Sequence, residues 1–197
     1  PNYQKLTYRT RAEGHNMLLI NPDYVGNPNK YENFHDVKFG ANATIDKYVT
    51  KPRGAFAITN VSELYEADVE SAWRGVKLDN YRRTVTIQDE VVMKKPGEIY
   101  WFAHTEGQIE VAPDGKSATV ELNGKKLLCE IAHGDGATFS VLDAVPLPSS
   151  PKVEGQNSNA GIKKLTIHVE NTKELNLMVV MNPLDDTYDE ESYSREF

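Results

Sequence analysis

The chain has 197 residues, of which 39% are hydrophobic and 26% are charged, which is enough for one large β domain or two small ones. The net charge of −7 argues against a nucleic-acid partner and against an anionic membrane surface, because both require a basic surface. No apolar run approaches the roughly 18 residues that a membrane-spanning helix needs. The single cysteine, Cys129, cannot form an internal disulfide, and its apolar neighbours indicate a buried strand position.

Short apolar or alternating segments separated by turn residues follow one another along the chain and predict β strands. They cover 15–20, 54–59, 81–87, 90–93, 98–105, 109–111, 118–122, 127–128, 139–145, 164–169 and 175–181. The segment 81–87 alternates with a period of two, which would place Arg82 and Arg83 on opposite faces of a strand. Helical periodicity is weak and is confined to 62–73. These patterns predict an all-β fold, an antiparallel β-sandwich with little helix.

Two β-hairpins are predicted by their turn residues. Pro113, Asp114 and Gly115 lie between two apolar segments, and the fixed backbone of proline followed by Asp-Gly favours a tight turn. Asn123 and Gly124 form the second turn, because this pair adopts the left-handed backbone that a two-residue hairpin requires.

Two long segments and the end of the chain have loop composition. Residues 21–44 are rich in Asn, Gly, Pro and Tyr, and residues 146–161 are rich in Pro, Ser, Gly and Asn. Long loops on a β scaffold often carry function. We expect one β-sandwich domain over 1–183 and an acidic, flexible tail over 184–197.

Histidines are the main candidates for chemistry, because nucleophile elbows, phosphate loops, Cys-x-x-Cys pairs and His-Glu-x-x-His are all missing from the sequence. His15 opens one predicted strand and His104 ends another, so both rings would be held at fixed geometry. With the carboxylate of Asp68 they would form a His-Asp-His set suited to zinc. The alternative is that both histidines are semi-buried and bonded to the backbone. His35, in the first long loop, has the same two interpretations.

Aromatic side chains in or beside the first long loop suggest a second theme. Tyr24, Tyr31, Phe34 and Tyr48 have this position. Sugar rings pack on aromatic faces, and a phenol of lowered pKa can transfer protons. The alternative is that these rings fasten the loop to the sandwich.

The segment Arg11 to Asn21, RAEGHNMLLIN, resembles the Arg/Ser-x-His-Asn-Thr-Val-Val-Val-Asp signature of heparinase II/III-like polysaccharide lyases. Later elements follow in the order expected for that family, over roughly residues 8–183. They are Ala67-Asp68, the Tyr-x-Arg-x-Val segment from Tyr81, the aromatic strand that ends at His104, the hairpin-rich region and the Leu-Pro-Ser-Ser-Pro loop. Met17 departs from the family's usual Thr, and the insertion between His15 and Asp68 is long.

This resemblance implies the β-super-sandwich of a two-part enzyme that cleaves an acidic, uronic-acid-containing polysaccharide by β-elimination. In the family, an N-terminal helical toroid packs on the sandwich and supplies most catalytic groups, and we expect that toroid to be missing from this chain. By position, the resemblance implies a structural zinc on His15, Asp68 and His104, with Arg11 and Asn16 lining the substrate cleft. His15 has a second role open to it, as a catalytic neutralising group, and zinc binding would compete with that role.

The expected partners are therefore an acidic polysaccharide and the helical domain, with no nucleic acid and no membrane. The resemblance also implies export to a bacterial periplasm or beyond, and a chain that is inactive by itself. Two other functions stay open at this point. One is a non-catalytic carbohydrate-binding sandwich that uses aromatic loops, and the other is a structural domain with an apolar face for a partner domain.

Overall fold

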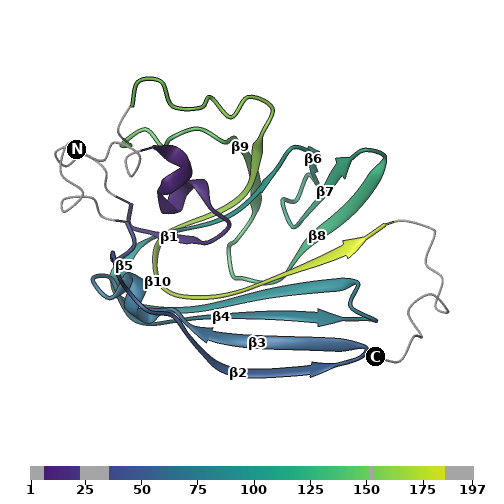
Figure 1. The fold of residues 1–197 in the computed structure, drawn as a ribbon, viewed down its shortest axis with the longest axis horizontal. Coiled ribbons are helices and arrows are strands. Elements are labelled where there is room, and N and C mark those ends of the chain that lie inside the picture. Colours follow the sequence, from purple (N-terminus) through teal and green to yellow (C-terminus); the bar gives the residue numbers. More distant parts are fainter. Residues whose placement is uncertain (1–6, 23–35, 151–152, 185–197) are drawn as a thin grey trace.

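The computed structural model describes residues 7–22, 36–150 and 153–184, and these fold into antiparallel β structure with three short 3₁₀ turns (Figure 1). The strands are β1 (Leu18–Ile20), β2 (Thr44–Lys51), β3 (Gly54–Asn60), β4 (Val69–Asp79), β5 (Thr84–Thr105), β6 (Gln108–Val111), β7 (Ser117–Leu122), β8 (Lys125–His133), β9 (Phe139–Asp143) and β10 (Lys163–Pro183). The turns are η2 (Tyr8–Thr10), η3 (Ala12–Gly14) and η5 (Ser62–Tyr65). The predicted all-β sandwich is confirmed. No helix within the described ranges is long and apolar enough to cross a membrane.

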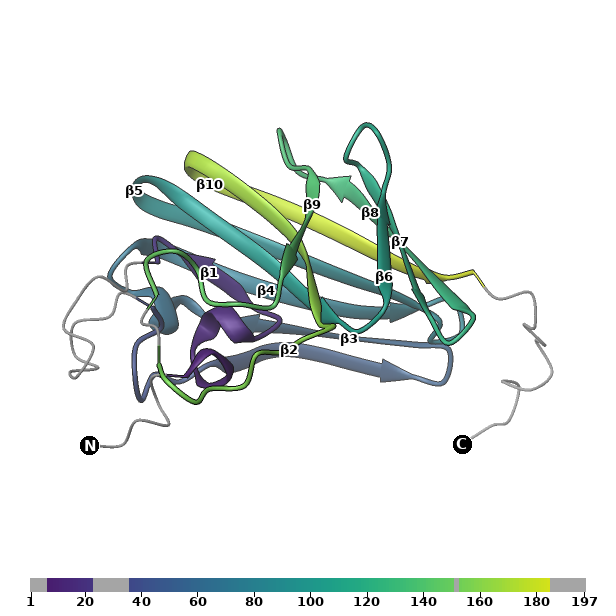
Figure 2. The same cartoon turned by 90° about the horizontal axis from the view of Figure 1, so that it is seen from above.

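Two long strands, β5 and β10, build the sandwich by passing through both of its layers (Figures 1 and 2). The first half of β5 pairs with β4 on one side and with the second half of β10 on the other. These segments belong to a sheet with the strand order β2-β3-β4-β5-β10-β8-β7-β6, which we name the large layer. The second half of β5 pairs with β1 and with the first half of β10, which also pairs with β9. These four segments form the small layer. The pairing of β5 with β10 shifts register between Val169 and Glu174, where the strands turn from one layer to the other.

The hydrophobic core lies between the two layers. Alternation along β5 turns Ile99 and Trp101 inward, at 1% and 2% exposure, and turns Tyr100, Phe102 and His104 to the opposite face. From the large layer, fully buried residues such as Ala72, Val91, Leu177 and Val179 meet Leu18, Ile20, Leu165 and Ile167 of the small layer. Burying these side chains is the main stabilising term, at about 25 cal/mol per Å² of apolar surface.

Several sequence expectations change in the structure. Tyr81 and Arg82 have φ of 56° and 66° and belong to the turn before β5, so Arg82 and Arg83 do not lie on opposite faces of one strand. The weak helical pattern over 62–73 is realised as the one-turn η5 followed by β4. The first correction follows from the tight turn between Asp79 and Thr84, three of whose residues have left-handed backbone and pair with no strand. The second follows because pairing of β4 with β3 and β5 overrides the weak local preference.

The two predicted hairpins are confirmed. Asn123 and Gly124 have φ of 52° and 74° and join β7 to β8, while the turn after Ala112 joins β6 to β7. Strand β2 was not predicted by its sequence. Much of the first long loop, including Tyr24, Tyr31, Phe34 and His35, lies outside the described residues, as does the tail from Asp185.

Candidate functional site

His104, near the end of β5, is the centre of a hydrogen-bonded group at one edge of the small layer. We name this edge, formed by Tyr8, His15, Asn16 and His104, the rim. Asn16 Oδ1 accepts both the backbone N–H of His104, at 2.8 Å, and its ring Nδ1–H, at 2.9 Å. Because the amide oxygen can only accept, Nδ1 carries the proton and Nε2 is left as an acceptor. The hydroxyl of Tyr8, 2.7 Å away, donates to that Nε2. The tautomer of His104 is therefore fixed from both sides.

Burial keeps this group neutral. Desolvation, followed by the charges of Lys164 and His15, lowers the pKa of His104 to about 4. Burial, followed by the charge of Glu13, raises the pKa of the Tyr8 phenol well above its usual range. Near pH 7 the phenol holds its proton and the imidazole is uncharged, so together they form a neutral donor–acceptor pair.

Lys164 supports the pair from beneath. It stands opposite His104 in the β5–β10 register and is 1% exposed. Its ammonium lies 5.3 Å from the centre of the Tyr8 ring and 4.6 Å from that of Phe102, so it is held by two aromatic faces. Burial lowers the pKa of Lys164, with the charge of Glu13 acting in the opposite direction.

Arg11, predicted to line the cleft, is 4% exposed and pairs with Glu13, which has no exposed surface. The second carboxylate oxygen of Glu13 accepts the backbone N–H of Leu147 at 2.9 Å and the hydroxyl of Ser150 at 2.8 Å. This buried group anchors the segment that carries Tyr8 to the loop after β9. The structure thus places Arg11 beneath the rim and Asn16, which is exposed, on it.

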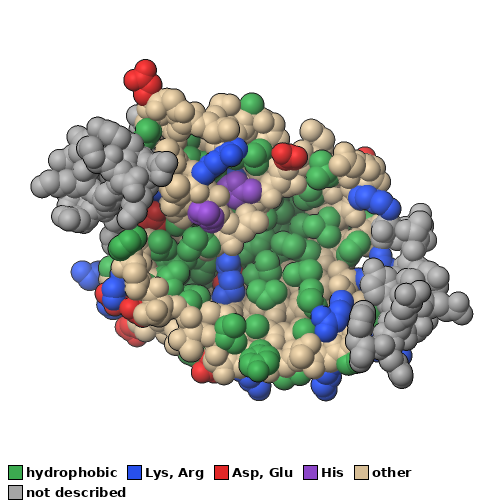
Figure 3. All heavy atoms as spheres, in the orientation of Figure 1, with side chains coloured by type: hydrophobic (Ala, Val, Ile, Leu, Met, Phe, Trp, Pro, Cys, Tyr) green, Lys and Arg blue, Asp and Glu red, His purple; other side chains and the backbone are tan. Residues whose placement is uncertain are grey.

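A hollow opens beside the rim, between the small layer and the inner face of the large layer. Its cavity volume is about 280 Å³, and Asn16, Arg74, Phe102, His104, Val120 and Leu127 are among its lining residues. Figure 3 shows two histidine side chains next to an apolar depression, with basic side chains nearby.

Arg74 is the basic group that lines this hollow. It binds the fully buried Asp89 through two hydrogen bonds, of 2.7 and 2.9 Å, and donates to the backbone oxygen of Asn16 at 3.1 Å. Burial raises the pKa of the Asp89 carboxyl, and Arg74 opposes that change. The bidentate pair holds the guanidinium at fixed geometry.

The structure separates one of the three residues expected to bind zinc, Asp68, from the other two, His15 and His104. His15 is exposed and contributes to the electrostatics of His104 at the rim. Asp68 instead accepts a 2.7 Å hydrogen bond from the side chain of Asn21. Asn21 follows β1 at its far end, where it pairs with Glu98. His15 and Asp68 therefore lie toward opposite ends of β1, whereas His15 and His104 share one end.

Within the described residues, a different trio meets the distance requirement of a metal site. One ligand atom each from Glu98, His168 and Glu170 lie within 4.8 Å of one another. This group lies on the outer face of the small layer, six residues before His104 along β5. A three-residue group with metal-binding chemistry therefore exists in the chain.

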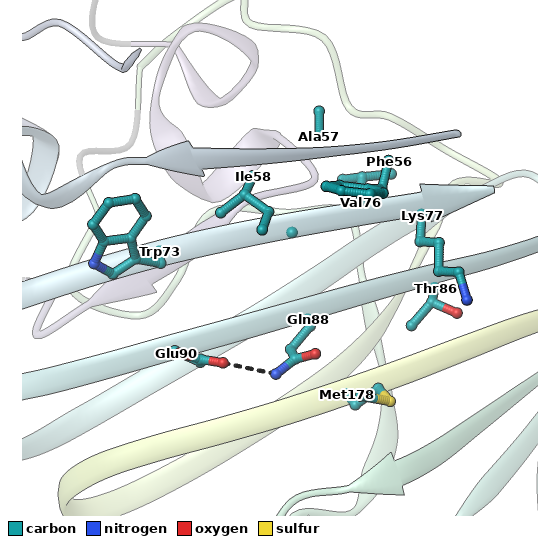
Figure 4. Close-up of a pocket in the computed structure, with 11 residues that line it drawn as sticks. Phe56, Ala57, Ile58, Trp73, Val76, Lys77, Thr86, Gln88, Glu90 and Met178 are labelled. Atoms are coloured by element: carbon teal, nitrogen blue, oxygen red, sulfur yellow. Dashed lines mark hydrogen bonds between the residues drawn. The ribbon is translucent and has the colours of Figure 1, made fainter. Parts of the chain in front are cut away.

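A second hollow lies on the outer face of the large layer, with a cavity volume of about 530 Å³ (Figure 4). Its lining includes Phe56, Ile58, Trp73, Gly75, Lys77, Gln88, Glu90 and Met178. Figure 4 shows these side chains standing on neighbouring strands, with Gln88 donating to Glu90 at 2.8 Å. Gly75 leaves an open floor, since no atom lies closer than 3.9 Å to the place of a β carbon there.

The residues at the rim were only partly visible in the sequence. His15, Asn16 and His104 were singled out, and the structure brings them together. Tyr8, Arg74 and Lys164 were missed, because each acts through partners far along the chain. For Arg74 and Lys164, the closest signal in the sequence is a basic residue within a strand whose apolar and polar residues alternate.

Comparisons with known proteins agree on the fold. No family model and no curated protein matches the sequence. Among solved structures, the heparan sulfate lyase HepC from Pedobacter heparinus superimposes with a TM-score of 0.62 at 10% identity, over 92% of this chain and 25% of the lyase. A heparinase III gives a TM-score of 0.63 at 13% identity, over 93% of this chain and 28% of that protein. The chain thus spans about a quarter of the length of these lyases, and its fold is that of their sandwich part.

Proposed function

We propose that this chain is the sandwich portion of a polysaccharide lyase that cleaves an acidic, uronic-acid-containing polysaccharide by β-elimination. The observation that carries the proposal is the Tyr8–His104–Asn16 group at the rim of the hollow, on a fold shared with heparan sulfate lyases. In this proposal the rim is one wall of the substrate cleft. A helical domain, a further part of the proposal, supplies the opposite wall.

The chemistry of elimination fits the character of the rim. Such a reaction removes the proton next to a carboxylate, stabilises the charge that develops, and protonates the departing oxygen. Asn16 and His15 are exposed and would contact the sugar, while Arg74, already paired with Asp89, would hold the backbone of Asn16 through its 3.1 Å hydrogen bond. His104 and Tyr8 would hold Asn16 in place, and Arg11 would anchor the segment from below.

Binding without cleavage is the test of this proposal. We expect heparan sulfate oligosaccharides to bind the chain in calorimetric titrations, and no unsaturated product to appear in ultraviolet absorbance. Asn16→Ala and His15→Ala should each weaken binding by about three- to tenfold, the size of one lost hydrogen bond. His133→Ala, an exposed position on β8, is the control. Unchanged affinity in both rim variants would refute the rim as the cleft wall.

The zinc expected on His15, Asp68 and His104 also stays a proposal, and it requires rearrangement. Asp68 would have to leave Asn21, and His104 would have to exchange Tyr8 or Asn16 for the metal. Loss of bound zinc in His15→Ala and His104→Ala, measured by mass spectrometry, would support it. Export to the periplasm or outside the cell is likewise proposed from the lyase likeness.

The second hollow, on the outer face of the large layer, favours a second candidate function, carbohydrate binding without catalysis. Trp73 and Phe56 offer apolar ring faces, while Gln88, Glu90 and Lys77 offer hydrogen-bonding groups beside them. Sugars are commonly bound by such a combination. Trp73→Ala should abolish binding of neutral oligosaccharides here and leave binding at the rim unchanged. If Trp73→Ala has no effect on any glycan, the second candidate is excluded.

A further inference from the structure

The Glu98–His168–Glu170 group lies where β5 and β10 leave the small layer. Glu98 and Tyr100 alternate to the outer face of β5, and His168 stands opposite Tyr100 on β10. Asn171, with φ of 51°, starts the irregular turn of β10, and Glu170 comes directly before it. The bend therefore brings a carboxylate from each strand to the same imidazole.

The imidazole is already aimed at these carboxylates. His168 Nε2 lies 2.8 Å from Glu98 Oε2, and the ring stacks on Tyr100 with centroids 3.8 Å apart and planes within 5°. Stacking on a strand-borne ring fixes the plane of the imidazole, so little side-chain entropy remains to be lost on binding a ligand. The ligand atoms of all three residues lie within 4.8 Å of one another.

Among the described residues, no Lys or Arg balances the charges of this group. In the part of the chain that the structure describes, Glu98 forms an ion pair with His168, and neither Glu98 nor Glu170 has a Lys or Arg partner within 4.0 Å. Two carboxylates this close repel each other unless a proton or a cation lies between them.

We propose that Glu98, His168 and Glu170 bind a divalent transition metal ion, with zinc the best match, which joins β5 to β10 at the bend. One imidazole nitrogen and two carboxylate oxygens are common zinc ligands, at about 2.0–2.2 Å. Calcium and magnesium prefer oxygen ligands alone, so the imidazole discriminates against them. A water molecule completes four-coordination. The ring is held by Tyr100, as metal-bound imidazoles are commonly held by a neighbouring group.

Metal titration of the full chain, first stripped with a chelator, tests the site. We expect calorimetry to show one zinc ion that His15→Ala does not remove, a higher Tm with zinc, and a far weaker response to calcium. Glu170→Gln is the main variant, because Glu170 is exposed and its loss leaves the fold intact. It should weaken zinc binding at least tenfold, as should His168→Gln. Cobalt in place of zinc should give a visible absorption band that Glu170→Gln removes.

His15→Ala is the matched control, because it removes a histidine from the other end of β1 and leaves this group untouched. Zinc binding that survives His15→Ala and is lost in Glu170→Gln confirms the assignment. Binding lost in His15→Ala and kept in Glu170→Gln overturns it in favour of the rim. Absence of zinc binding in the stripped wild-type chain also overturns it, and would show that Glu98 and His168 form a simple ion pair. Neither negative result bears on polysaccharide binding at the rim.

Discussion

Acidification from pH 7 to pH 4.5 should destabilise the folded chain by an amount that depends on His104. The pKa of this ring is lowered from its usual 6.5 to about 4 in the folded state, so the unfolded chain takes up the proton first. Its contribution to stability is therefore complete above pH 6.5 and is lost as the pH falls from there toward 4. Protonation would also place a second donor on Nε2, facing the Tyr8 hydroxyl.

The magnitude follows from the same two values. At 1.36 kcal/mol per pKa unit, the difference between the unfolded pKa of 6.5 and the folded pKa of about 4 changes the free energy of unfolding by at most about 3.4 kcal/mol. Because the ring is only half-buried, solvent screening lowers the expected loss to about 1–2 kcal/mol. In His104→Gln the side-chain oxygen still accepts from Tyr8 but does not titrate. The variant should therefore lose about 1–2 kcal/mol less than the wild type between pH 7 and pH 4.5.

Urea unfolding at pH 7, 5.5 and 4.5, followed by tryptophan fluorescence, measures this difference. Carboxylates that protonate over the same range affect both proteins equally and cancel in the comparison. His133→Gln, which removes an exposed histidine of β8, should keep the full wild-type loss. An equal loss in His104→Gln and the wild type would refute the assignment of the pH dependence to the rim.

Three further predictions concern stability and are measured by the same unfolding assay. Arg74→Met leaves the carboxylate of Asp89 buried and unpaired and should lower the free energy of unfolding by about 3–5 kcal/mol. Adding Asp89→Leu to Arg74→Met should recover much of that loss, and no recovery would contradict the pairing argument. Leu19→Ala, at a position with no exposed surface between Ala12 and Phe102, should cost about 2–5 kcal/mol, and a loss under 1 kcal/mol would mean that this small cluster is not well packed. Gly97→Ala places a β carbon against the side chain of Asn21 and should lower the free energy of unfolding by about 1–3 kcal/mol. Gly75→Ala, where the space is open, should be neutral or slightly stabilising. Equal effects at both glycines would refute this steric explanation.

Local signals in the sequence predict the local parts of this fold. The Asn123–Gly124 turn was predicted because both residues tolerate the left-handed backbone, whatever surrounds them. The β5 segments were predicted separately as 81–87, 90–93 and 98–105, since Lys94, Lys95 and Pro96 interrupt the alternation. In the structure they form one strand, because β10 pairs along nearly its whole length.

The candidate site was predicted only where chemistry and strand position coincide. His104 lies near the end of β5 as predicted, whereas His15 follows η3 and precedes β1 by three residues instead of opening a strand. The pairing of β1 with β5 still brings this segment to the end of β5. Tyr8 reaches His104 across 96 positions of sequence, and nothing in its local sequence indicates that contact. The metal-binding chemistry of Glu98 and His168 was missed for the same reason, because it depends on the register between strands 70 residues apart.

The path of β10 also constrains how the chain can fold during synthesis. This strand pairs with β5, β8 and β9, and it is the last strand of the described chain to leave the ribosome. Until then β5 and β8 are open edges that flank an unfilled gap in the middle of the large layer. Contacts of such long sequence separation form slowly, and open edges invite pairing with other chains. Truncation before Lys163 should therefore yield an aggregating chain rather than a smaller sandwich.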